Sequence, residues 1–255
     1  MKWWKKYTGY IREGITYSTY PFKKKNKPSK KFVIFTVGRS GSNLLVNLLD
    51  LHPDIHCNNE LLSKRVVFPS LYLNLCENLS SRDVYGFKLL TYHFDIQKTT
   101  DYLNFIDELI LAGYLIISLK RHNILRQAVS HIYALHRQKF HHKSKQGEQI
   151  HSVISVDIDN LKEELELFTD HREREEIVLE KYPYFQLFYE DDLFDTQCHQ
   201  RTIDRISDYL GIPTAKVESD YLRTTPDHLS RFIENFNEVR DYISQTEFKE
   251  FLEDI

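Results

Sequence analysis

Cysteine is scarce in this 255-residue chain, and its three copies, Cys57, Cys76 and Cys198, lie far apart without a C-x-x-C pair. Such spacing argues against a disulfide framework or a zinc site and fits a reducing compartment. Long apolar runs are missing too, since no stretch reaches the roughly 18 apolar residues of a membrane span. The chain begins MKWWKK, which lacks the apolar segment of a secretory signal. We therefore expect a cytoplasmic protein without a transmembrane segment.

An excess of positive charge is also absent, because 34 Lys and Arg stand against 37 Asp and Glu, for a formal net charge of −3. A nucleic-acid partner is therefore not expected. No linker rich in Gly, Ser or Pro divides the chain, which favours a single domain over residues 32–255.

Residues 1–31 form a basic, aromatic arm ahead of that domain. The arm holds both tryptophans, several tyrosines and the lysine-rich run 23–27. One interpretation is peripheral contact with a membrane surface or with a partner. The other is a solvated leader that packs a few aromatic rings on the domain. The aromatic residues show no clean helical face, which favours the second interpretation.

Residues 32–49 carry the most informative pattern, FVIFTVGRSGSNLLVNLL. Its apolar, β-branched start predicts a buried parallel strand, and its leucines have helical spacing. A strand, a glycine turn and a helix aim backbone N–H groups and a positive helix end at a phosphate or sulfate, and Arg39 adds a fixed positive charge. The turn lacks the lysine of a Walker A motif, so arginine and backbone would hold the anion. The alternative is an ordinary strand-turn-helix joint. The buried strand, the arginine and the hydroxyl at the start of the helix together favour the anion site.

Further strands and helices alternate along the chain. Apolar runs predict strands at 84–90, 114–119 and 185–189, while LHPDI at 51–55 indicates a helix stop and a turn. Predicted helices cover residues 61–80, 99–112, 123–135, 158–181 and 197–210, with a polar loop over 137–152. This order predicts an α/β fold with a P-loop-like central parallel sheet, helices on both faces and ligands at the carboxyl ends of its strands.

A second constellation follows the strand at 114–119. Arg121 comes at the carboxyl end of this strand, on the same sheet edge as the glycine loop, and Ser130 lies roughly two turns into the next helix. An arginine and a hydroxyl placed in this way can hold a second anion. The alternative is a solvent-facing arginine and a serine that packs its helix.

Together these segments resemble the sulfotransferases that use 3′-phosphoadenosine 5′-phosphosulfate (PAPS). The loop 36–45 (TVGRSGSNLL) is similar to the family's 5′-phosphosulfate loop, with Asn43 where threonine is usual. The segment 120–130 (KRHNILRQAVS) is similar to its 3′-phosphate motif, and QAVS to that of the bacterial trehalose and Nod-factor group. Further matches follow in the family's order at His52–Ile55 with Glu60, Gly86–Lys88, Leu187–Asp191 and Thr224–Asn235.

The resemblance implies a sulfotransferase-type fold with a donor site for PAPS and no required metal. The phosphosulfate would be held by loop residues Arg39, Ser40, Gly41, Ser42 and Asn43. Arg121 and Ser130 would hold the 3′-phosphate, and Tyr189 would lie near the adenine. Arg223 or Thr225 would close over the nucleotide.

The implied chemistry also needs a general base for the acceptor's proton. Glu60 is the first candidate, because it follows the loop and its helix and returns near the strand ends. The alternative is a surface glutamate in a charged loop. His93 is the second candidate for the base. Lys88 would stabilise the bridging oxygen, unless it is a core-edge lysine that reaches solvent.

The implied reaction transfers a sulfuryl group from PAPS to a hydroxyl or amine of a small-molecule natural product or a carbohydrate. One alternative is a small-molecule kinase on a related fold, which would need a lysine in the loop. Another is a non-catalytic relative that binds nucleotide or glycan. The histidines His136, His141, His142 and His151 fit no standard metal-ligand spacing.

Overall fold

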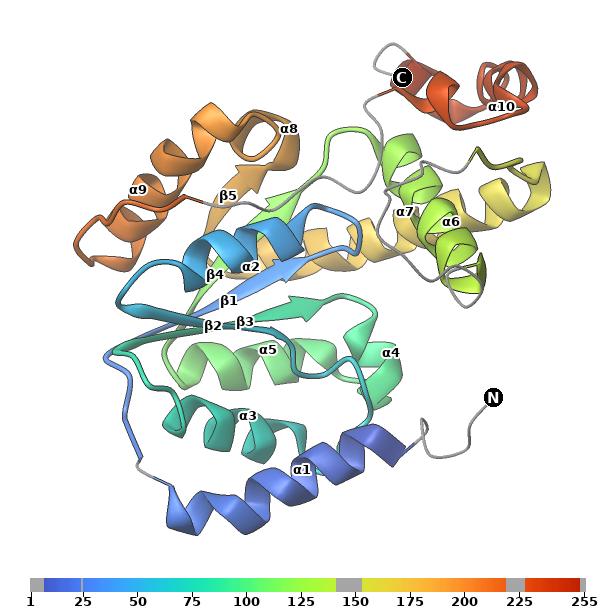
Figure 1. The fold of residues 1–255 in the computed structure, drawn as a ribbon. Helices are drawn as coiled ribbons and strands as arrows, with labels where there is room; N and C mark the ends of the chain where they lie inside the picture. Colours follow the sequence, from blue (N-terminus) through green and yellow to red (C-terminus); the bar gives the residue numbers. More distant parts are fainter. Residues whose placement is uncertain (1–6, 24, 141–152, 219–227, 253–255) are drawn as a thin grey trace. The chain divides into compact units, whose positions relative to one another are not determined.

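The structure, a computed structural model, describes residues 7–23, 25–140, 153–218 and 228–252 (Figure 1). The chain divides into two compact units, Met1–Lys120 with Arg174–Asp220 and Arg121–Glu173 with Tyr221–Ile255. The first unit carries the whole sheet, and the second is mainly helical. Within the described ranges, no helix is both long and apolar enough to cross a membrane.

Five parallel strands form the sheet of the first unit, in the order β2-β3-β1-β4-β5. They are β1 (Lys30–Thr36), β2 (Ile55–Glu60), β3 (Val84–Leu90), β4 (Tyr114–Lys120) and β5 (Tyr184–Phe188). The chain leaves β1 toward β2 on one side, while neighbouring β4 leads to β5 on the other. The two strands therefore diverge at a topological switch point, where open α/β sheets bind their ligands.

Helices cover both faces of this sheet, which confirms the predicted α/β class (Figure 1). Phe32 and Ile34 of β1 face α2 and α9, whereas Val33 and Phe35 face α3, α5 and the end of α7. The helices of this unit are α2 (Ser42–Asp50), α3 (Pro69–Asn78), α4 (His93–Gln97), α5 (Tyr102–Leu111), the end of α7 (Ile158–Lys181), α8 (Tyr189–Asp192), η3 (Thr196–Cys198) and α9 (His199–Leu210). The strand residues alternate between two apolar cores, as a sheet buried on both faces requires.

The N-terminal arm contains a helix that the sequence pattern does not predict. Helix α1 (Thr8–Thr19), followed by η2 (Tyr20–Phe22), packs on α3. Buried Glu13 accepts hydrogen bonds from the backbone N–H groups of Val67 (2.7 Å) and Phe68 (2.9 Å). The helix is therefore fixed to the first unit by a charged side chain and not by an apolar stripe, which is why hydrophobic periodicity missed it.

One further element was not predicted, and two element boundaries differ from the prediction. The pattern predicts no strand between residues 51 and 60, yet Ile55–Glu60 forms the edge strand β2, whose polar sequence lacks a long apolar run. The interpretation of Glu60 as a loop residue is therefore wrong. The helix predicted over 61–80 is confined to Pro69–Asn78, with proline in its first turn. The predicted loop 137–152 begins too early, because α6 continues to Phe140.

The second unit is built around α6. Asn123 caps this helix by accepting from the Arg126 N–H (2.9 Å), and its amide donates to the Phe251 carbonyl (2.8 Å). An isolated parallel bridge joins Ile154 to Ile233. The elements here are α6 (Ile124–Phe140), the first part of α7, η4 (Leu229–Arg231), α10 (Phe236–Ile243) and η5 (Glu247–Leu252).

Candidate active site

The glycine loop between β1 and α2 has the backbone conformation that the sequence leads one to expect of an anion cradle. Gly41, the N-cap of α2, has φ +88°, and Arg39 has φ +64°, which is uncommon for a residue with a side chain. The N–H groups of a helix's first turn have no carbonyl of their own helix to bond, and glycine offers no side chain to cap them. The Leu44 N–H donates to the Gly41 carbonyl (2.9 Å), which leaves the N–H groups of Ser42 and Asn43 and the positive end of α2 for an anionic group.

Tyr189 lies directly on this loop. A Cβ added to Gly41 would come within 2.3 Å of the Tyr189 ring, so the ring occupies the space that any larger residue would need. Tyr189 begins α8 immediately after β5, and it is buried. The structure therefore brings together two of the predicted donor-site residues that are distant in the sequence.

The side chain of Ser40 faces the interior. It is fully buried, and the Thr36 hydroxyl lies 2.7 Å from its Oγ and 2.5 Å from the Leu119 carbonyl oxygen. This cluster ties the loop to the ends of β1 and β4. Any contact of Ser40 with a ligand would then come from its backbone, and its place in the donor site stays a prediction.

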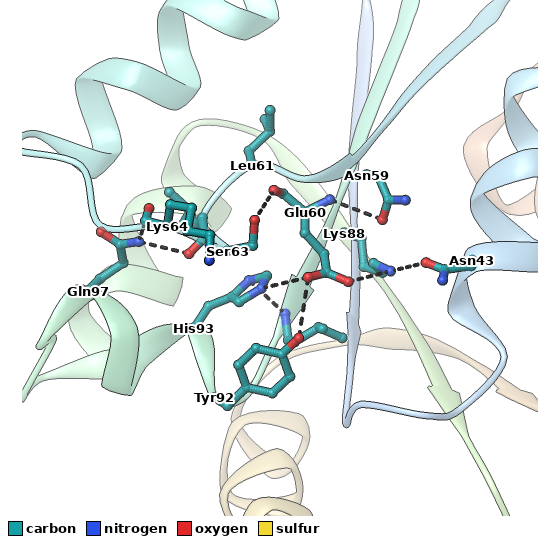
Figure 2. Close-up of polar contacts among 12 residues, drawn as sticks. Asn43, Asn59, Glu60, Leu61, Ser63, Lys64, Lys88, Tyr92, His93 and Gln97 are labelled. Atoms are coloured by element: carbon teal, nitrogen blue, oxygen red, sulfur yellow. Dashed lines mark hydrogen bonds and ion pairs between the residues drawn. The ribbon is translucent and has the colours of Figure 1, made fainter. Parts of the chain in front are cut away.

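Beside the loop, Glu60 ends β2 and faces Lys88 of β3 across the strand register (Figure 2). The Lys88 Nζ lies 2.9 Å from Glu60 Oε1 and also donates to Asn43 Oδ1, at the start of α2. Lys88 is only 2% exposed, so the alternative of a lysine that reaches solvent is wrong. Burial lowers the pKa of Lys88, and the Glu60 carboxylate partly offsets that effect.

Two further side chains hold the second carboxylate oxygen of Glu60 (Figure 2). The Tyr92 hydroxyl donates to Oε2 at 3.3 Å, and His93 Nε2 lies 3.6 Å from the same oxygen. His93 is fully buried, and its Nδ1 accepts the Leu90 backbone N–H at 3.2 Å. A neutral imidazole with an accepting Nδ1 carries its proton on Nε2, so His93 presents an N–H to Glu60.

These contacts set the protonation states of Glu60 and His93. The nearby Nε2–H of His93 lowers the pKa of Glu60 to about 2, against burial, and Lys88 adds to the decrease. Burial lowers the pKa of His93. Glu60 is therefore an ionised carboxylate at neutral pH, and its side chain is 28% exposed. The lone pair of His93, in contrast, is occupied by the backbone.

Arg121 and Ser130 belong to the second unit. Arg121 follows directly on the last residue of β4, and Ser130 is buried in α6. Arg172 ties the two segments by donating to the Arg121 carbonyl (2.5 Å) and to Gln127 Oε1 (2.9 Å). Arg223 and Thr225 lie outside the described residues. The 3′-phosphate pair and the closing residues stay predictions.

Sequence reasoning missed two members of these clusters, Thr36 and Tyr92. Both stand at or just after the carboxyl end of a strand, β1 and β3 respectively, and this position was the signal that could have found them. Across the ranges that the structure describes, no three His, Cys, Asp or Glu side chains gather closely enough to hold a metal ion.

No family model and no curated protein matches the sequence. Among solved structures, a sulfotransferase from Alicyclobacillus acidocaldarius aligns at 16% identity and a TM-score of 0.49, over 89% of this chain and 96% of that chain. Mouse sulfotransferase SULT7A1, solved in complex with PAP, aligns at 13% identity and a TM-score of 0.48, over 94% of this chain and 93% of that chain. At identities and TM-scores this low, the likenesses by themselves assign neither a family nor an activity.

Proposed function

We propose that this protein is a sulfotransferase that moves a sulfuryl group from PAPS to a hydroxyl or amine of a small-molecule or carbohydrate acceptor. The observation that carries the proposal is the position of Glu60. An ionised, partly exposed carboxylate, fixed by Lys88, Tyr92 and His93, stands at the carboxyl end of the sheet beside a glycine loop that contains no lysine. A base beside an anion cradle is what sulfuryl transfer to a neutral nucleophile needs.

The donor supplies an activated sulfuryl group and a bisphosphate leaving group. The residues present fit its anionic part, since the N-terminus of α2 begins at a glycine and Arg39 adds a permanent charge. Arg39 and the backbone of residues 40–43 would bind the phosphosulfate, with Ser42 assisting. Arg121 and Ser130 would distinguish the 3′-phosphate, and Tyr189 would flank the nucleotide.

Glu60 is the proposed base, and it takes the acceptor's proton. Lys88 is proposed to neutralise charge at the leaving oxygen, and it also keeps Asn43 and Glu60 together. His93 and Tyr92 orient the carboxylate through its second oxygen. The two candidate bases, Glu60 and His93, are therefore proposed to have different roles. Glu60 is partly exposed, whereas the lone pair of His93 accepts the Leu90 N–H.

A thermal-shift measurement tests the donor site. Adenosine 3′,5′-bisphosphate is compared in EDTA with AMP, which lacks the 3′-phosphate, and ATP is measured separately in a buffer with magnesium and without EDTA. A ligand at roughly 100 times its dissociation constant adds about 2.7 kcal/mol of stability. We expect stabilisation by the bisphosphate alone, followed by turnover of PAPS with a panel of sugars and small amines. A shift only with magnesium-ATP would favour the kinase and overturn the proposal.

A further inference from the structure

Helix α1 presents a row of apolar side chains on the side away from α3. We name Tyr7, Ile11, Ile15 and Phe22 the outer face of α1; their side chains are between 45% and 89% exposed. Spacing by four residues places the first three on one side of the helix, opposite the buried Gly9 and Glu13. Three large apolar side chains in one exposed row, followed by exposed Phe22 at the end of η2, form a candidate interaction surface.

Positive charge is concentrated in the part of the sequence that contains this helix. The first 27 residues hold eight of the 34 Lys and Arg of the chain but one of its 37 Asp and Glu, whereas the whole chain is net negative. That one acid, Glu13, is buried and bonded to the Val67 and Phe68 N–H groups. Lys23 and Lys25 follow the helix and are exposed. The charge complements an anionic partner.

A second chain segment with basic and apolar side chains packs on the opposite, buried side of α1. The backbone of Arg65 packs against α1, because a Cβ on Gly9 would come within 2.1 Å of the Arg65 carbonyl oxygen. Lys64 and Arg65 are exposed, and so are the apolar Val67 and Phe68 that follow them. These side chains border α1 on its buried side and are not part of the outer face of α1, which therefore rests on its own residues and on the lysines that follow the helix.

We propose that the outer face of α1 docks the protein on an anionic membrane surface. Its apolar side chains would enter the boundary between headgroups and acyl chains, while the lysines contact lipid phosphates. A second copy of the chain fits less well, since a symmetric contact would oppose the same lysines to each other. Nucleic acid would use the charges but not the exposed isoleucines Ile11 and Ile15.

Tryptophan fluorescence tests this docking directly, because both tryptophans of the chain, Trp3 and Trp4, lie a few residues before the first residue of α1, Thr8. The full chain is titrated with phosphatidylcholine vesicles and with vesicles of phosphatidylcholine and phosphatidylglycerol, and co-sedimentation is measured in parallel. We expect a blue shift and co-sedimentation only with the anionic vesicles, both weakened by salt. Equal behaviour with both vesicle types would overturn the proposal.

Two variants and a matched control locate the surface. Ile11→Gln with Ile15→Gln should weaken binding about tenfold for each side chain. Leu111→Gln with Ile177→Gln, on exposed positions of α5 and α7, should leave it unchanged. Lys23→Gln, Lys25→Gln and Lys27→Gln together should weaken binding by about 100-fold, at about fivefold for each lysine near an anionic surface.

Sedimentation velocity supplies the competing outcome. If the wild-type chain forms a dimer that the Ile11→Gln, Ile15→Gln pair dissociates, a second copy covers the outer face of α1 and the membrane proposal is wrong. Unchanged vesicle binding of the same variant overturns it as well. Since both isoleucines are exposed, the circular dichroism spectrum of the variant should match that of the wild type.

Discussion

Replacing His93 by glutamine and, separately, by asparagine tests which of two neighbouring groups takes the acceptor's proton. Glutamine retains an N–H that can reach Glu60, in the place of Nε2–H, but loses the acceptor for the Leu90 N–H. Asparagine retains that acceptor, in the place of Nδ1, but loses the donor to Glu60. The two variants therefore separate the Leu90 hydrogen bond of this buried imidazole from its longer contact with Glu60.

The structure sets the size of the expected effects. The decrease of the Glu60 pKa from its usual 4.5 to about 2 corresponds to about 3 kcal/mol. This is a net value, in which His93 and Lys88 lower the pKa and burial raises it. The Nε2 to Oε2 distance of 3.6 Å is long, so the loss of this contact should lie near the lower limit of about 1.5 kcal/mol for a charged hydrogen bond. We expect His93→Asn to lose roughly tenfold in turnover, and His93→Gln to stay close to the wild type.

The assay is kcat/KM for PAPS-dependent sulfation between about pH 5 and about pH 9. The 3′-phosphate of the donor titrates near pH 6 by itself, so the ratio of wild-type to His93→Gln activity is the useful quantity. With Glu60 as base, this ratio stays flat, because a carboxylate with a lowered pKa is ionised throughout the range.

A different result would refute the reasoning. If His93 were the base, both variants would lose about 10²-fold to 10⁴-fold, and the wild-type activity would fall below the lowered pKa of His93 while the residual activity of the variants would not. Glu60→Gln is the companion measurement, since it should lose activity by a similar factor and still bind the bisphosphate. Melting temperatures of all three variants establish that they are folded.

Four further outcomes are expected. Because folding lowers the pKa of Glu60, its stabilising contribution is present above pH 4.5 and is lost as the pH falls toward 2; urea unfolding between about pH 6 and about pH 3 should show a smaller loss in Glu60→Gln than in the wild type. Gly41→Ala should lower the free energy of unfolding by at least about 1–2 kcal/mol, because φ is positive and the Tyr189 ring fills the space of the Cβ. Gly14→Ala, in open space on α1, should raise it by up to about 1 kcal/mol. Equal melting temperatures for the two variants would contradict this. Arg121→Ala should weaken bisphosphate binding in calorimetry by roughly 10-fold to 150-fold and leave AMP unaffected; undiminished affinity would remove the arginine from the donor site. Glu13→Gln should lower the free energy of unfolding by about 1–3 kcal/mol in urea, because an amide cannot accept both backbone N–H groups at the same oxygens.

The glycine loop was readable because everything that defines it is local. An apolar run, a turn and a leucine-spaced helix lie within residues 32–49, and each obeys its own short-range rule. The same holds for β3, whose predicted bounds of 84–90 the structure reproduces, and for α7 at 158–181. The parallel arrangement followed from the alternation of these elements.

Edge strand β2 and helix α1 escaped the sequence analysis for a common reason. Each is stabilised by polar contacts to distant segments: β2 by its ladder with β3, and α1 by Glu13 and the N–H groups of Val67 and Phe68. Neither leaves a periodic apolar pattern in its own residues, because the free energy that holds it in place comes from partners elsewhere in the chain.

The amino-acid sequence by itself determined the fold class, the loop and the short set of candidate residues around it. Only the tertiary structure shows how these side chains contact one another. Parallel pairing of β2 with β3 sets Glu60 against Lys88, and the turn after β3 directs His93 back to the Leu90 N–H. That single hydrogen bond fixes which nitrogen carries the proton, and no pattern of residue types contains this information because it depends on the direction of one ring in space.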